Sequence, residues 1–315
     1  MYRPSLSLSI GVALCAALAG CGSGPTPPKS SLTFSFDAAY GTPGSLPGQL
    51  SGHIGIDVGS GPTPDIYVAD TLNNRVQILS TTGGPPVVIG GPGSGPVQFL
   101  LPTDVVLVGS TLYVTDRGNA RVQQVTLLGG FVRQFGVAGT GPGEFVAPTY
   151  IAASAAELFV VDSQLARVQV FDLDGNFLRS FGSFGSGDGE LQVPRGVALA
   201  GSGGAYVSSR DAGRVELFDG LGDFVLNLGT PGTRFGQLTA PEGVALDARG
   251  MVYVSNSGNN RIELFHSSGT PDTNFGSFGG GPGQMSQPTD LAIDGLGRVY
   301  VSDTGNGRVQ RFVSP

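Results

Sequence analysis

The chain has 315 residues, of which 53 are glycine, 22 are proline and none is tryptophan, and only 13% are charged. This composition favours many short strands joined by tight turns, because glycine supplies positive φ and proline fixes φ in turns. The formal net charge of −7 argues against nucleic acid as a partner, since a phosphate backbone requires clustered Lys and Arg.

The first twenty residues have the pattern of a secretory signal. Arg3 precedes an apolar run over residues 6–19, which ends in small side chains. The run is too short for a membrane-spanning helix, which needs about 20 apolar residues. We therefore expect residues 1–20 to be a signal peptide that directs export.

Residues 18–21, Leu-Ala-Gly-Cys, resemble the bacterial lipobox. The resemblance implies that Cys21 carries a lipid anchor and becomes the new N-terminus. It also implies a place in the bacterial cell envelope, outside the cytoplasm, and in an outer membrane if the cell has one, because Gly22 rather than Asp follows the cysteine. An ordinary signal with a chance cysteine is the alternative. Residues 21–31, rich in Pro, Gly and Ser, are expected to form a tether.

A repeat of 46 or 47 residues fills the rest of the chain. Its clearest mark is an Arg followed by Val or Ile, at Arg75, Arg121, Arg167, Arg214, Arg261 and Arg308. An aromatic column keeps the same period at Tyr67, Tyr113, Phe159, Tyr206, Tyr253 and Tyr300. A polar column follows three residues later at Asp70, Asp116, Asp162, Ser209, Asn256 and Asp303. Another column holds His53, Pro102, Pro148, Pro194, Pro241 and Pro288. Such a rhythm indicates six copies of one structural unit.

The fifth copy shows the expected strands most clearly. Residues 244–247 form a short apolar run that suits a strand buried on both faces. Residues 251–254 are β-branched and aromatic, and residues 261–265 alternate polar with apolar side chains, as a half-exposed strand does. A fourth strand is expected to end near residue 275. Four strands in about 46 residues is the size of a propeller blade.

The same copy carries a recognisable motif. It reads Pro-x-Gly-Val-Ala-Leu-Asp over residues 241–247, Val-Tyr-Val-Ser-Asn over 252–256 and Asn-x-Arg-Ile-x-x-Phe over 259–265. This pattern resembles the NHL repeat, and the resemblance extends over residues 32–313. It implies an all-β fold, a six-bladed β-propeller of four-stranded blades that occupies residues 32–315. The absence of Trp argues against WD40 and similar propellers, which are marked by that residue.

The two ends of the chain predict how the ring closes. The last repeat stops at its third strand, over residues 308–313. Residues 36–50 align without a gap to residues 224–238, which include the fourth strand of another repeat. We therefore expect residues 32–41 to supply the outer strand of the last blade, because this pairing removes an open sheet edge.

The Asp and Arg columns admit two interpretations, a ligand-binding ring of charges or a structural device. A residue that recurs in every blade is expected to have a structural role in every blade. We therefore expect each Asp to cap its turn and each Arg to pair with it. The aromatic column is expected to pack between blades rather than to form a carbohydrate platform.

Positions that differ between blades carry more information about function. In related propellers the start of the inner strand faces the central mouth. This position and its neighbours give a candidate ligand ring of His53, Asp104, Tyr150, Arg195, Glu242 and Asp290. His53, Asp104 and Asp290 come from adjacent blades and are candidates for a divalent cation, although solvated turn residues are the alternative. Arg195 and Glu242 are expected to form an ion pair at the rim.

The choice between enzyme and binding module depends on catalytic groups. Streptogramin lyase, peptidyl-hydroxyglycine lyase and the gluconolactonase group resemble this fold, and their chemistry needs a general base or a metal at the mouth. The chain has only His53 and His266, and it shows neither a recognisable Ser-His-Asp set nor a phosphate loop. We therefore expect a monomeric binding or scaffold module, without a required cofactor, for an extracytoplasmic protein, peptide or glycan. A lyase-like or lactonase-like enzyme and a purely structural envelope protein remain as alternatives.

Overall fold

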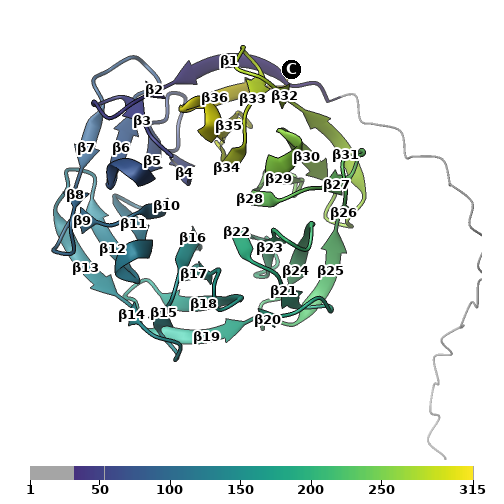
Figure 1. Cartoon of the computed structure of the whole chain (residues 1–315), viewed down its shortest axis with the longest axis horizontal. Coiled ribbons are helices and arrows are strands. Elements are labelled where there is room, and N and C mark those ends of the chain that lie inside the picture. The colour runs from purple at the N-terminus through teal and green to yellow at the C-terminus, as the bar shows by residue number, and fades with distance from the viewer. Residues whose placement is uncertain (1–31, 53, 315) are drawn as a thin grey trace, which may run out of the picture.

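Six four-stranded antiparallel sheets surround a central channel in the computed structural model, which describes residues 32–52 and 54–314 (Figure 1). From the channel outward, blade 1 consists of β4 (Ile56–Val58), β5 (Ile66–Asp70), β6 (Arg75–Leu79) and β7 (Val87–Ile89). Blade 2 consists of β10 (Pro102–Val108), β11 (Thr111–Asp116), β12 (Arg121–Thr126) and β13 (Phe131–Phe135). Blade 3 consists of β16 (Pro148–Ala153), β17 (Glu157–Asp162), β18 (Arg167–Asp172) and β19 (Phe177–Phe181). The predicted number and make-up of the blades are confirmed.

The second half of the ring repeats this order. Blade 4 consists of β22 (Pro194–Leu199), β23 (Ala205–Ser209), β24 (Arg214–Phe218) and β25 (Phe224–Leu228). Blade 5 consists of β28 (Pro241–Leu246), β29 (Val252–Asn256), β30 (Arg261–Phe265) and β31 (Pro271–Phe275). Blade 6 consists of β34 (Pro288–Ile293), β35 (Val299–Asp303), β36 (Arg308–Val313) and β1 (Ser35–Tyr40). Inner strand β28 begins before the predicted residue 244, because a bulge between Pro241 and Val244 lets Pro241 pair with Asn256.

Short parallel ladders and single helical turns complete the described part of the chain. The ladders are β2 (Thr42–Pro43) with β3 (Gln49–Leu50), β8 (Gly91–Pro92) with β9 (Gln98–Phe99), β14 (Val137–Ala138) with β15 (Glu144–Phe145), β20 (Ser183–Phe184) with β21 (Glu190–Leu191), β26 (Thr230–Pro231) with β27 (Gln237–Leu238), and β32 (Ser277–Phe278) with β33 (Gln284–Met285). The 3-10 turns are η1 (Thr71–Asn73), η2 (Arg117–Asn119), η3 (Ser257–Asn259) and η4 (Thr304–Asn306). No helix in these residues has the length and apolar character that crossing a membrane requires.

The ring closes as the sequence predicts. β1 pairs with β36 from Ser35 opposite Val313 to Tyr40 opposite Val309, so the start of the described chain completes the last blade (Figure 1). The Arg311 guanidinium lies 2.5 Å from the Asp37 carboxylate. The Phe34 ring stacks on Phe275 of blade 5, with centroids 4.4 Å apart.

The Arg column ties each blade to the loop that enters it. In blade 1, Arg75 Nε donates to Asp70 Oδ2 at 2.7 Å, and its Nη2 donates to the carbonyls of Leu46 and Gln49. Asp70 Oδ1 accepts the Ser51 N–H and makes no capping bond to η1, so the expected turn cap is wrong for Asp70. The carboxylate orders the incoming loop instead. In blade 3 the cap does occur, because Asp162 Oδ1 accepts the N–H of Leu165 in its own turn at 3.3 Å.

The expected Asp–Arg pair occurs in blades 1, 2 and 6 and not in the other three. Arg167 in blade 3 binds only backbone carbonyls among the hydrogen bonds of its guanidinium. In blades 4 and 5, where Ser209 and Asn256 replace Asp, the Arg pairs with Glu216 or Glu263. Glutamine stands at this Glu position in the other blades, at Gln77, Gln123, Gln169 and Gln310. Blades 4 and 5 therefore keep one buried carboxylate but place it on the neighbouring strand.

This exchange predicts a rescue experiment in blade 5. Glu263→Gln should lower the free energy of unfolding by about 2–3 kcal/mol, because Arg261 loses its partly buried partner. Asn256→Asp in the same chain recreates the arrangement of blades 1, 2 and 6 and should restore at least half of the loss. Urea unfolding at neutral pH measures both values. A double variant no more stable than Glu263→Gln alone would contradict the exchange.

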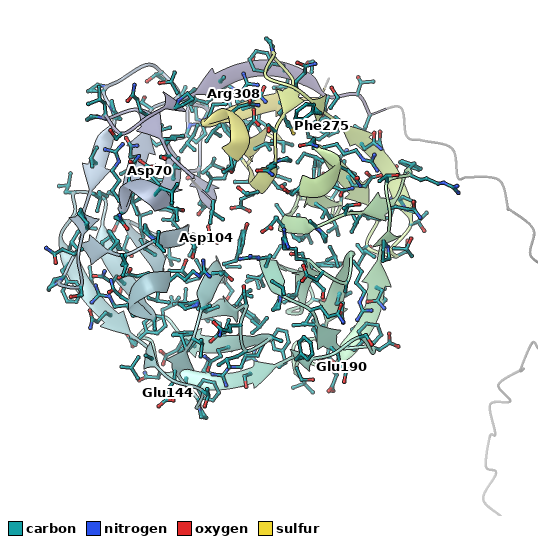
Figure 2. The ribbon with its side chains drawn as sticks, in the orientation of Figure 1. Asp70, Asp104, Glu144, Glu190, Phe275 and Arg308 are labelled. Carbon is teal, nitrogen blue, oxygen red and sulfur yellow. The ribbon has the colours of Figure 1, made fainter. Side chains whose placement is uncertain are left out.

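The core lies between adjacent blades. The six side chains of the aromatic column are at most 5% exposed, which confirms their expected packing role. Figure 2 shows Asp104 at the channel, whereas Phe275 lies in the outer part of its blade. The blades thus bury their apolar faces against one another and leave the inner strands to line the channel.

Candidate functional site

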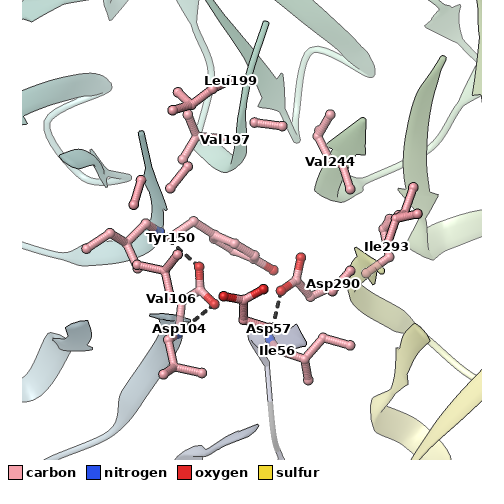
Figure 3. Close-up of a pocket in the computed structure, with 18 of the residues that line it drawn as sticks. Ile56, Asp57, Asp104, Val106, Tyr150, Val197, Leu199, Val244, Asp290 and Ile293 are labelled. Carbon is pink, nitrogen blue, oxygen red and sulfur yellow. Dashed lines mark hydrogen bonds between the residues drawn. The ribbon is translucent and has the colours of Figure 1, made fainter. Parts of the chain in front are cut away.

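The central channel contains a cavity of about 310 Å³, lined by the inner strands of all six blades (Figure 3). Its walls are largely apolar and include Val106, Leu199, Leu246 and Ile293. Its polar groups are the carboxyls of Asp57, Asp104 and Asp290 and the ring of Tyr150. None of the described residues that line it is basic.

The three carboxyls come from neighbouring blades 1, 2 and 6. Each one accepts the N–H of the inner strand in the next blade around the ring. These pairs are Asp57 Oδ2 with Leu107 N at 2.7 Å, Asp104 Oδ2 with Ile151 N at 2.9 Å and Asp290 Oδ2 with Ile56 N at 2.8 Å. The carboxyls therefore join four consecutive blades, 6, 1, 2 and 3, and still face a common cavity.

Glycine on the preceding blade makes room for two of them. A Cβ atom at Gly55 would lie 1.9 Å from Asp104 Oδ1, and one at Gly243 would lie 2.3 Å from Asp290 Oδ1. Any larger residue at these two positions would displace the carboxyl of the next blade.

Burial raises the pKa values of all three carboxyls, because a low-dielectric site disfavours the charged form. The pKa of Asp57 rises to about 6 and that of Asp290 to about 8, although backbone N–H donors act in the opposite direction. The pKa of Asp104 is raised well above its usual range, first by burial and then by the charge of Asp290. Burial therefore favours the protonated forms of Asp104 and Asp290 near neutral pH, and it does so less for Asp57.

Tyr150 crosses the channel at the level of Asp104 and Asp290 (Figure 3). Its hydroxyl donates to the Thr289 carbonyl of blade 6 at 2.9 Å and lies 3.5 Å from Glu242 Oε2. Burial, followed by the charges of Glu242 and Asp290, raises the pKa of Tyr150 well above its usual value. The phenol thus stays protonated and donates its hydrogen bond.

Glu242 lies behind Tyr150 with two arginines. Arg195 is 3.6 Å from its carboxylate, which bears out the expected contact, and Arg210 is closer, at 2.9 Å. Burial raises the pKa of Glu242, and the two arginines act against this rise. Glu242 is only 9% exposed, so the pair lies inside the ring rather than at a solvated rim.

The structure brings together only part of the ring expected from the sequence. Asp104, Tyr150 and Asp290 meet at one end of the cavity, while Glu242 and Arg195 do not line it. His53 lies outside the described residues. Within residues 32–52 and 54–314, no three His, Cys, Asp or Glu side chains are placed to hold a metal ion. The divalent cation stays a prediction.

Asp57 is a cavity residue that sequence reasoning missed. The positions that correspond to it in blades 3 to 6 are all alanine, namely Ala152, Ala198, Ala245 and Ala292. A carboxylate in an alanine column was the signal that could have revealed it. Because four blades fold with alanine there, the blade itself does not require the carboxyl.

Two family models match parts of the chain. The NHL repeat matches residues 285–312, and a family described as a 6-bladed beta-propeller matches residues 102–181. No curated protein sequence is significantly similar to the chain.

Solved structures resemble the whole ring at low sequence identity. Streptogramin B lyase is 12% identical with a TM-score of 0.61, covering 90% of this chain and 98% of its own. A gluconolactonase from Xanthomonas campestris is 13% identical with a TM-score of 0.63, covering 92% and 99%. A nidogen/laminin complex gives 18% identity and a TM-score of 0.56, covering 71% and 79%. At these identities the likeness concerns the fold alone. The chain is a six-bladed β-propeller that carries NHL repeats.

Proposed function

We propose that the chain is a binding module whose central cavity takes the ammonium group of a peptide or protein partner. The observation that carries the proposal is a cavity with three carboxyls and no basic side chain among its described lining residues. An ammonium group donates three hydrogen bonds, and the alkyl stem that bears it packs well on apolar walls. Leu199, Leu246 and Ile293 supply such walls.

Charge supports this choice of ligand. A buried carboxyl without a cation is costly, and the chain places three of them around one space. An entering cation stabilises their ionised forms and offsets that cost. A neutral glycan lacks this complementarity, so we favour a peptide or protein over the other ligand class that the sequence left open.

The open end of the cavity supports a basic partner as well. The lining residues extend to Ala153, Leu199 and Leu246, where the inner strands end, so the cavity faces the loops that follow them. Exposed carboxylates lie on loops of this same face, including Asp65 and Asp219. A field of this sign attracts a positively charged segment before it docks.

We also propose that the module is exported and held in the bacterial cell envelope by a lipid on Cys21. The signal-like residues 1–20 and the lipobox-like residues 18–21 support this placement, and they lie outside the described part of the chain. Labelled palmitate should enter the natural chain and not Cys21→Ala, and labelling of that variant would contradict the anchor.

Calorimetric titration with n-butylammonium at pH 7.5 tests the cavity. The natural chain should bind it, and Asp57→Ala should weaken binding at least tenfold, because the variant removes one of the three carboxyls. The fold should not change, because blades 3 to 6 carry alanine at this position. Asp65→Asn removes an exposed carboxylate of the same face and serves as the matched control with little effect. 1-Butanol, the neutral counterpart, should bind much more weakly. Equal affinities for the amine and the alcohol would contradict the proposal.

A second candidate is a propeller enzyme of the lyase or lactonase kind. The observation in its favour is the buried Asp290, whose pKa of about 8 suits a general acid or base at a cavity. Hydrolysis of gluconolactone that is lost in Asp290→Asn would favour catalysis over binding.

A further inference from the structure

We propose that Tyr150 closes one end of the channel and sets the length of the cation that the cavity accepts. This inference rests on the proposed binding of an ammonium group. The length of the bound cation would then depend on this one side chain, because the corresponding residues of the other blades do not close the channel.

Tyr150 is the exception in its column. The corresponding residues of the other blades are Gly55, Asp104, Gly196, Gly243 and Asp290. Three of the six blades therefore leave the channel free at this level, and two contribute a short carboxyl. Only the tyrosine is long enough to reach across.

The side chain spans the central channel between the inner strands of opposite blades. Blade 3, which carries Tyr150, stands opposite blade 6, which carries Thr289 (Figure 1). The hydroxyl nevertheless donates to the Thr289 carbonyl at 2.9 Å. The residue is 2% exposed, so the ring is held by packing as well as by its hydrogen bond. Figure 3 shows it lying between Asp104 and Asp290.

The cavity stops where Tyr150 lies. The residues that line it begin at the level of Asp104, Tyr150 and Asp290 and continue along the inner strands. None of the six residues one position earlier lines it, namely Ile54, Thr103, Thr149, Arg195, Glu242 and Thr289. Beyond the phenol lies Glu242, held by Arg195 and Arg210. The cavity is thus open toward one face and closed toward the other.

A closed end limits how deep a ligand can enter. The inner strand rises about 3.3 Å per residue, so the three steps from Tyr150 to Ala153, the end of the lined region, give a depth of about 10 Å. An ammonium group that reaches Asp104 and Asp290 places its alkyl chain along the apolar walls. Carbon atoms beyond this depth lie in solvent and add nothing to the affinity.

A series of n-alkylammonium ions from butyl to dodecyl tests the limit by calorimetry. In the natural chain the affinity should rise about fourfold for each added methylene and then reach a plateau. Tyr150→Gly, the residue of blades 1, 4 and 5, removes the closed end, so the ammonium group can pass Asp104 and Asp290 toward the Glu242 carboxylate. The plateau should therefore move to longer chains. Tyr150→Phe keeps the ring and should leave the plateau in place.

The outcomes separate this inference from the proposed function. No binding of any member by the natural chain would overturn both. Binding with a plateau that Tyr150→Gly does not move would overturn the closure by Tyr150 alone. If the glycine variant does not fold, Tyr150→Leu provides the same test, because it shortens the side chain and should give an intermediate shift.

Discussion

A chain that lacks residues 32–39 is expected not to form a stable ring at 25 °C. The deletion removes the ladder between β1 and β36, the ion pair between Asp37 and Arg311, and the stacking of Phe34 on Phe275. It also leaves β36 as an open edge and exposes the core between blades 5 and 6. Since a domain is stable by only about 5–15 kcal/mol, the loss of a whole strand is comparable with that total.

Thermal unfolding followed by circular dichroism measures the effect. A chain that begins at Leu32 is the matched control and should unfold at the temperature of the full chain, because it keeps β1 complete. A chain without residues 32–39 that melts cooperatively at that same temperature would show that the ring does not depend on this strand.

Stability is expected to fall as the pH rises from about 5 to about 9. The pKa of Asp290 is raised from 3.8 to about 8, and that of Asp57 to about 6. Between these limits the folded state holds protons that the unfolded state has already released, so the free energy of unfolding decreases with pH. The stabilisation is complete below about pH 4 and is lost as the pH passes about 8. A tenfold change in an acid dissociation constant corresponds to about 1.4 kcal/mol, so the total loss amounts to several kcal/mol.

Asp290→Asn isolates the contribution of one group. The amide oxygen can still accept the Ile56 N–H, but it carries no charge at any pH. The variant should match the natural chain below about pH 4, exceed its stability at pH 9 and show a flatter pH dependence. Urea unfolding across this range provides the values. Stability of the natural chain that rises between pH 6 and pH 9 would contradict the raised pKa values.

The repeat made most of the fold predictable from the sequence. The Arg and aromatic columns fixed the number of blades, because each marks a strand at a constant place in the unit. The gapless match of residues 36–50 to residues 224–238 located the closing strand without any knowledge of the ring. These features depend on local patterns that recur, and a recurring pattern can be read from one chain.

The site was less predictable because it depends on contacts between blades. Asp57 occupies a position that looks like ordinary core until the other blades are aligned with it. Arg210 approaches Glu242 from a turn of the neighbouring blade, and sequence spacing does not show this distance. The turn cap expected of Asp70 was wrong for the same reason, since Asp70 binds a loop residue 19 positions away.

The central claim is that the carboxyls of the cavity form a cation site, and the release of protons on binding tests it most directly. An ammonium ion that pairs with these carboxyls must lower the pKa values of Asp104 and Asp290, which burial raises most, and displace protons from them. n-Butylammonium is fully protonated at pH 7.5 and stays so when it pairs with carboxylates, so any proton released comes from the protein. Titration at pH 7.5 in phosphate and in HEPES, neither of which carries a primary ammonium group, should give heats that differ by the number of protons released times the difference between the ionisation enthalpies of the two buffers. Binding with identical heats in both buffers, or no binding at all, would contradict a cation site formed by these carboxyls.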